Sequence, residues 1–220
     1  MAESGSRPAS EEALSGADAR ELLVLVREML EGLCEHGIEV STETRSMAPL
    51  LEGAERIFWR TPEPPPRRGD VVIYYQRPRG GGEGLSGLIH RCLVVHRLIR
   101  CRREGGMRTK GDGRPQMDLG VLPTEAVLGV VTRILRADGS VSLEGAAARR
   151  YGLVIAALSG AGAGVYQLAA YADAVLRRLI PGLGRRRVLR APAWWVQRLA
   201  IVGAHRLLAG RCLCQREGPA

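Results

Sequence analysis

Three residue types that together can hydrolyse peptides occur in order along this chain of 220 residues: a serine, a histidine and an aspartate. Ser46 is followed three positions later by Pro49, His96 lies in an apolar run, and Asp112 and Asp118 come after it. A serine hydroxyl becomes a nucleophile when a neighbouring base takes its proton, and a carboxylate can hold that base in place. Proline disrupts regular structure three residues after the serine, which favours a tight turn that exposes the hydroxyl. The pattern therefore indicates a serine hydrolase site.

Short motifs surround these residues in a fixed order over about residues 38 to 135. They are Ser46-Met47-Ala48-Pro49, Gly69-Asp70-Val71-Val72, Val95-His96-Arg97-Leu98, Thr109-Lys110-Gly111-Asp112-Gly113, Asp118, and Val127-Leu128-Gly129-Val130-Val131. This set resembles the signal peptidase I family of serine peptidases, whose fold is shared with LexA-type peptidases. Within that family it is most similar to the archaeal and endoplasmic-reticulum branch, which pairs serine with histidine.

The resemblance implies a role for each matched residue. Ser46 would be the nucleophile and His96, at the family's base position, the general base. Asp112 or Asp118 would orient the imidazole, and Asp118 aligns with the family's second aspartate. The backbone N–H of Ser46 and the hydroxyl of Thr44 would stabilise the oxyanion.

Two further expectations concern the base and the substrate. Histidine has an unperturbed pKa of about 6.5, which suits a base near neutral pH. Lys110, the chain's only lysine, lies outside the family's base position and would need strong desolvation to act in a serine–lysine dyad. Arg45 stands where the family has glycine, and we expect Arg45 and Met47 to contact substrate. An extended peptide would bind by strand addition near residues 38 to 42.

The pattern of the chain changes at three points. Residues 1 to 12 are small, polar and charged, typical of a flexible terminus. Residues 13 to 37 have apolar residues at helical spacing, interrupted by charges that prevent a membrane span. Residues 38 to 140 alternate β-branched runs with Pro and Gly clusters, and residues 141 to 220 are helical in pattern. We therefore predict a mainly β fold, a coiled and partly closed β-sheet peptidase core, with an N-terminal amphipathic helix and a C-terminal helical extension.

The C-terminal region is both apolar and basic. Residues 151 to 172 include no charged side chain over 22 positions, long enough to cross a bilayer, although several glycines weaken that interpretation. Trp194 and Trp195 lie close to Arg198, a combination typical of an interfacial helix. Peripheral membrane contact, packing on the β unit and a true transmembrane span all remain open. Of these we favour the first, and we expect the protein in the cytoplasm or on a membrane surface.

Charge and cysteine content exclude other classes. The formal net charge is +9, but aromatic residues make up only 4% of the chain, so stacking platforms for nucleic-acid bases are scarce. The five cysteines include no Cys-x-x-Cys pair, which argues against a zinc site and leaves no cofactor or metal expected. No secretory signal is visible at the start of the sequence.

The sequence thus predicts a serine-type endopeptidase that cleaves a leader, signal or propeptide after small residues. Its partner would be a peptide or protein precursor, with a membrane surface as a second partner. Two alternatives stay open: a non-catalytic peptide-binding module of the same fold, and a LexA-type self-cleaving regulator. The latter would require a DNA-binding helix-turn-helix, for which a single short amphipathic helix is not enough.

Overall fold

A computed structural model describes residues 24–26, 28, 32, 37–39, 45–76, 93–102, 106–137, 139–180, 189–212 and 214–215, with side chains up to residue 209 in the last helix. Residues 1 to 12 and Thr44 lie outside these ranges. The predicted N-terminal helix is described only at residues 24–26, 28 and 32, which are helical.

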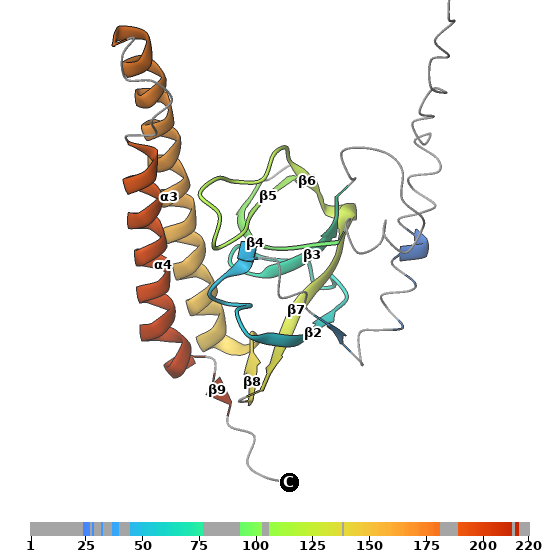
Figure 1. Cartoon of the computed structure of the whole chain (residues 1–220). Helices are drawn as coiled ribbons and strands as arrows, with labels where there is room; N and C mark the ends of the chain where they lie inside the picture. Colours follow the sequence, from blue (N-terminus) through green and yellow to red (C-terminus); the bar gives the residue numbers. More distant parts are fainter. Residues whose placement is uncertain are drawn as a thin grey trace, which may run out of the picture.

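The centre of the molecule is a curled antiparallel sheet (Figure 1). Its strands are β1 (Ile38–Glu39), β2 (Ala54–Arg60), β3 (Val71–Tyr75), β4 (Leu93–Cys101), β5 (Gly106–Lys110), β6 (Leu122–Pro123), β7 (Val127–Arg136), β8 (Gly139–Ser142) and β9 (Cys214–Gln215). The order across the sheet is β1-β2-β7-β3-β4-β5-β6, and β8 pairs with both β7 and β9. Two 3₁₀ turns, η1 (Arg45–Met47) and η2 (Thr124–Ala126), join strands.

Two helices complete the fold: α3 (Gly145–Leu179) and α4 (Arg190–Cys212). They lie side by side along one flank of the sheet and extend beyond it at one end (Figure 1). The structure therefore confirms a coiled β sheet followed by C-terminal helices.

Apolar side chains are buried on both faces of the sheet. Along β3, Val72 and Tyr74 belong to one buried cluster, while Val71 and Ile73 belong to the other. This follows from the two-residue period of a strand, which sends successive side chains to opposite faces. A strand that is buried on both faces has a continuous apolar sequence, as Val71–Tyr75 does.

Close backbone contact fixes α3 against the sheet. Gly69 has φ +98°, and a Cβ atom added to Gly152 of α3 would lie 2.7 Å from the carbonyl oxygen of Gly69. Only glycine allows this approach, because a side chain at either position would collide with backbone.

A buried carboxylate joins the two helices. Asp173 of α3 accepts hydrogen bonds from the backbone N–H groups of Leu189 and Arg190, at 3.0 and 3.2 Å. A carboxylate at a helix N-terminus satisfies free N–H groups and favours the helix dipole. Asp173 therefore holds the start of α4 against α3.

Candidate active site

Strands β3, β4 and β5 and the turn η1 bring the candidate residues together. Val72 of β3 is paired with His96 of β4, so the imidazole lies on the face that carries Val72 and Tyr74. Ser46 lies in η1, next to β4, and is half-buried. Pro49 follows within the turn that ends η1, as its position in the sequence predicts.

His96 is held by Asp118. The ring nitrogen Nδ1 of His96 lies 2.7 Å from Oδ2 of Asp118, and the His96 side chain is almost completely buried. Burial by itself raises the pKa of Asp118, but the hydrogen bond and charge of His96, with bonds from Thr109 and Tyr74, hold it below its usual value. The carboxylate is therefore ionised at neutral pH and favours the tautomer with the proton on Nδ1, which leaves Nε2 free to accept a proton.

The other ring nitrogen faces the serine turn across Gly111. A Cβ atom added to Gly111 would lie within 3.0 Å of both His96 Nε2 and the carbonyl oxygen of Ser46. His96 Nε2 and the carbonyl oxygen of Ser46 are therefore separated by no more than twice 3.0 Å. The backbone N–H of Gly113 also donates to the same Ser46 oxygen at 2.8 Å, which ties η1 to the loop after β5. Gly111 thus lies between His96 Nε2 and the backbone of Ser46.

A tyrosine completes the hydrogen bonding around the imidazole. The Tyr74 hydroxyl donates to Asp118 Oδ2 at 3.1 Å, lies 3.4 Å from His96 Nδ1, and accepts a bond from the Thr109 hydroxyl at 3.3 Å. Burial, and then the charge of Asp118, raise the pKa of Tyr74 well above its usual value, so the phenol stays protonated. Tyr74 therefore fixes the position of the Asp118 carboxylate.

Asp112 has a different partner. Both of its oxygens accept bonds from Arg97, at 2.7 to 3.1 Å, and the same guanidinium donates to the carbonyl oxygen of Gly69 at 2.8 Å. Both side chains are 1% exposed. Burial opposes the charge of Arg97, but the attraction of Asp112 outweighs it and raises the Arg97 pKa. Of the two candidate aspartates, Asp118 contacts the imidazole of His96, whereas Asp112 binds the guanidinium of Arg97.

Lys110 is fully buried on the side of the sheet that faces α3. Its ammonium donates to the carbonyl oxygen of Gly111 at 3.1 Å and lies 3.5 Å from the Ser159 hydroxyl of α3. Burial lowers the pKa of Lys110 to about 8, against the opposing attraction of Asp112 and Asp118. The lysine is thus desolvated, as a lysine base requires, but its contact with Ser159 connects β5 to the helix.

Two other residues proposed at this site differ in their placement. Met47 is 1% exposed and packs in the buried cluster with Leu50, so the expectation that it contacts substrate is wrong. The short 3₁₀ turn directs its side chain into the core, where burial of an apolar side chain is favourable. Arg45, by contrast, is exposed beside Ser46. The proposed oxyanion contribution of Thr44 lies outside the described residues.

Sequence reasoning overlooked Tyr74 and Gly111 as parts of this site. Tyr74 sits in an apolar strand, where an aromatic residue indicates core packing. One signal was present: a buried tyrosine hydroxyl needs a polar partner. Gly111 belongs to the motif Thr109–Gly113, but a residue without a side chain gives no indication in the sequence of what lies beside it.

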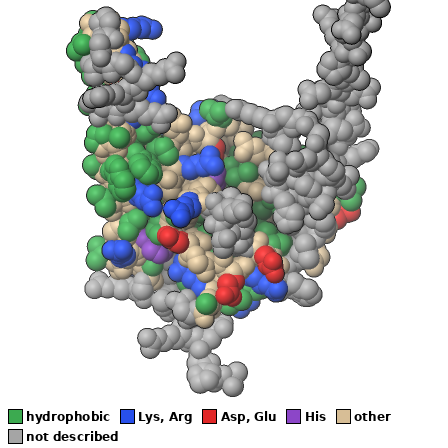
Figure 2. Space-filling view, in the orientation of Figure 1, with side chains coloured by type: hydrophobic (Ala, Val, Ile, Leu, Met, Phe, Trp, Pro, Cys, Tyr) green, Lys and Arg blue, Asp and Glu red, His purple; other side chains and the backbone are tan. Residues whose placement is uncertain are grey.

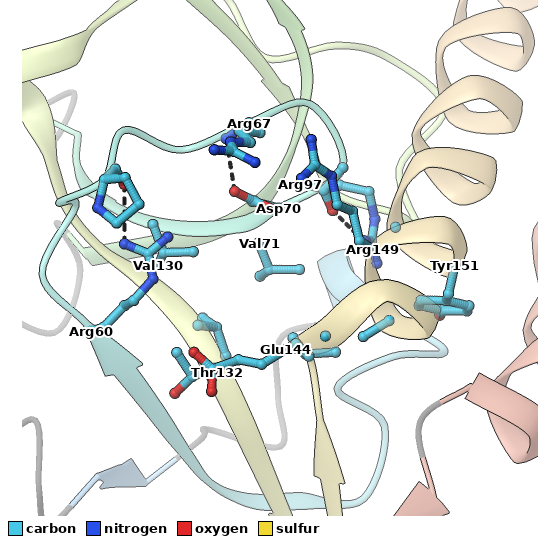
Figure 3. Close-up of a pocket in the computed structure, with 17 residues that line it drawn as sticks. Arg60, Arg67, Asp70, Val71, Arg97, Val130, Thr132, Glu144, Arg149 and Tyr151 are labelled. Carbon is cyan, nitrogen blue, oxygen red and sulfur yellow. Dashed lines mark hydrogen bonds between the residues drawn. The ribbon is translucent and has the colours of Figure 1, made fainter.

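The cavity drawn in Figure 3 is separate from this group. It has a volume of about 230 Å³ and lies where the start of α3 meets β3 and β7. Arginines 60, 67, 97 and 149 line it, but neither Ser46, His96 nor Asp118 does. One guanidinium nitrogen of Arg60 donates to the carbonyl oxygens of Thr61 and Pro64.

Comparison of the chain with protein-family models, with curated proteins and with solved structures finds no match.

Proposed function

We propose that the protein is a serine endopeptidase of the signal-peptidase-like class. The observation that supports this most directly is the position of one imidazole between a carboxylate and a serine turn. His96 contacts Asp118 through Nδ1, and its Nε2 lies against the glycine that also abuts Ser46. That arrangement supports the roles that the sequence motifs predict for these three residues.

In the proposed reaction Ser46 Oγ attacks the carbonyl carbon of the scissile peptide bond while His96 Nε2 takes the hydroxyl proton. The negative charge of Asp118 stabilises the imidazolium that forms. His96 then donates its proton to the leaving amine, the C–N bond breaks, and an ester to Ser46 remains. A water molecule, deprotonated by His96, hydrolyses the ester and releases the new carboxyl terminus.

The proposed substrate is an extended peptide with small residues before the scissile bond, such as a leader or propeptide. β1 ends the strand order at one side of the sheet, and its outer edge is unpaired within the described sheet. An extended peptide could pair with such an edge through its backbone, while shallow pockets accept small side chains. The size of the preferred side chains comes from the family resemblance.

A serine-reactive phosphonate tests the nucleophile and the base. Wild-type protein should form a covalent adduct that peptide mass spectrometry assigns to Ser46. Ser46→Ala should abolish the adduct, and His96→Ala should slow its formation by at least a hundredfold, because an unassisted hydroxyl is a weak nucleophile.

Ser140→Ala is the matched control, because Ser140 is also half-buried but lies in β8. Its labelling should equal that of wild type. An adduct that persists in Ser46→Ala would remove the proposed nucleophile, and undiminished labelling of His96→Ala would remove the base. An inert wild-type protein that still binds extended peptides would favour the non-catalytic alternative.

A further inference from the structure

The basic charge of the chain is concentrated in the helical hairpin. Residues 145 to 210 contain ten arginines and one aspartate, with no lysine or glutamate. Their net charge is therefore +9, equal to that of the entire chain. The single acid, Asp173, is buried against the start of α4, where it also forms an ion pair of 3.6 Å with Arg190.

Between these arginines, the solvent-exposed side of α3 is apolar over five turns. The exposed large side chains on it are Leu153, Val154, Val165, Leu168 and Tyr171. The smaller exposed residues between them are alanine and glycine, and Gln167 is the one exposed polar side chain between residues 153 and 171. At 1.5 Å per residue this surface is about 27 Å long. Contiguous apolar surface of this length on a protein marks a binding site.

The neighbouring helix continues the surface. Trp195, Val196, Leu199 and Leu207 of α4 are more than half exposed. The guanidinium of Arg198 lies 5.5 Å from the ring centre of Trp194 and 5.9 Å from that of Trp195. Figure 2 shows hydrophobic side chains gathered over the two helices with basic side chains among them. Tryptophan beside arginine is typical of helices at the boundary between water and lipid.

The packing of α3 against the sheet means that the first half of this helix cannot cross a bilayer surrounded by lipid. Within the described residues, α3 is the one helix long and apolar enough to cross a membrane. However, Gly152 contacts the backbone of Gly69, and Ser159 lies beside the ammonium of Lys110. Lipid cannot surround a helix whose inner side is packed on a sheet that carries charged groups. Contact with a bilayer must therefore be lateral, through the outer side alone.

We propose that the α3–α4 hairpin binds side-on to the surface of an anionic lipid bilayer. Its outer face is defined by Leu153, Val154, Val165, Leu168 and Tyr171 of α3 and Trp195, Val196, Leu199 and Leu207 of α4. The apolar side chains enter the boundary between headgroups and acyl chains, and the arginines bind lipid phosphates. The excess of +9 on this element selects an anionic bilayer over a neutral protein surface.

This orientation also places the serine turn close to lipid. A groove of about 490 Å³ is lined by Trp195, Arg198, Leu199 and Val202 of α4, and by Pro49 and Glu52 from the segment that follows Ser46. If the proposed function holds, the peptide bonds within reach are those of a segment near the membrane surface.

Vesicle flotation tests the lipid proposal without any reference to hydrolysis. Full-length protein carrying Ser46→Ala should float with vesicles of mixed phosphatidylcholine and phosphatidylglycerol, and at least tenfold less with phosphatidylcholine alone or at high salt. The double variant Leu168→Glu with Leu199→Glu should bind the mixed vesicles at least tenfold more weakly. Leu25→Glu should bind like the parent, because Leu25 is as exposed as Leu199, at 66% against 65%, but lies outside the hairpin.

Fluorescence provides a second measurement that needs no substitution in the hairpin. Trp194 and Trp195 belong to it, whereas the third tryptophan, Trp59, is in the core. Brominated lipid in the vesicles should therefore quench most of the exposed tryptophan emission. The proposal would be overturned if neither quenching nor flotation occurred. It would also be overturned if the double variant floated as strongly as its parent. A dimer that the double variant dissociates, with no vesicle binding, would overturn it as well, because the outer face would then cover a second copy.

Discussion

Replacing Lys110 with methionine should stabilise the protein at neutral pH. The ammonium is fully buried, and its pKa falls from the ordinary 10.5 to about 8. Because one pKa unit corresponds to about 1.36 kcal/mol, holding the charge in the folded state costs about 3 kcal/mol. Methionine has nearly the same length and no charge, but it loses the bonds to Gly111 and Ser159. We therefore expect a net gain of about 1–3 kcal/mol in the free energy of unfolding.

The pH dependence provides an internal control for this substitution. The unfolded chain keeps the lysine proton up to about pH 10.5, whereas the folded protein releases it near pH 8. Between these values the unfolded state binds more protons, so the stability of the wild type rises with pH. The advantage of Lys110→Met should be full below pH 8 and disappear above pH 10.5.

Urea unfolding at pH 7 and at pH 10.5, followed by circular dichroism, measures both effects. Phosphonate labelling of Ser46 should persist in Lys110→Met, because His96 is the proposed base. A variant less stable than wild type at pH 7 would refute the desolvation argument. A stable variant that no longer labels would instead favour a serine–lysine dyad.

Three further substitutions test the surroundings of His96. Asp118→Asn should lower kcat/KM on a peptide substrate by about 10³- to 10⁴-fold, because the amide does not hold the required tautomer. The stability that Asp118 contributes is present above the pKa that this carboxyl has in the unfolded chain. It is lost as the pH falls through the lower pKa of the folded state. Acid titration should therefore show this loss in wild type and not in the variant. Tyr74→Phe should raise the pKa of Asp118, seen by NMR, and cost about 1 kcal/mol, because the carboxylate loses one of its hydrogen bonds; an unchanged carboxylate pKa would contradict this. Arg97→Met should destabilise by about 3–5 kcal/mol by leaving Asp112 buried and unpaired, and adding Asp112→Asn should recover part of that loss in urea unfolding. If the second substitution makes unfolding still easier, Asp112 has partners other than Arg97.

Local patterns predicted several elements well. The run Val71–Tyr75 coincides with β3, and the uncharged stretch from residue 151 lies inside α3. The sequence of β5 has only a weak strand signal, because Gly106–Lys110 is short and contains two basic residues and a glycine. Its strand conformation depends on pairing with β4, which is a long-range interaction.

The sequence by itself determined the residue types at the candidate site and their order along the chain. Only the tertiary structure decided between Asp112 and Asp118, because both follow His96 at similar separations and differ solely in what folds against them. The buried guanidinium of Arg97 accounts for the hydrogen bonds of Asp112, whereas Asp118 returns to the face that carries Tyr74 and His96. Partner choice depends on which groups share a buried face, and that is a property of strand register rather than of any local motif.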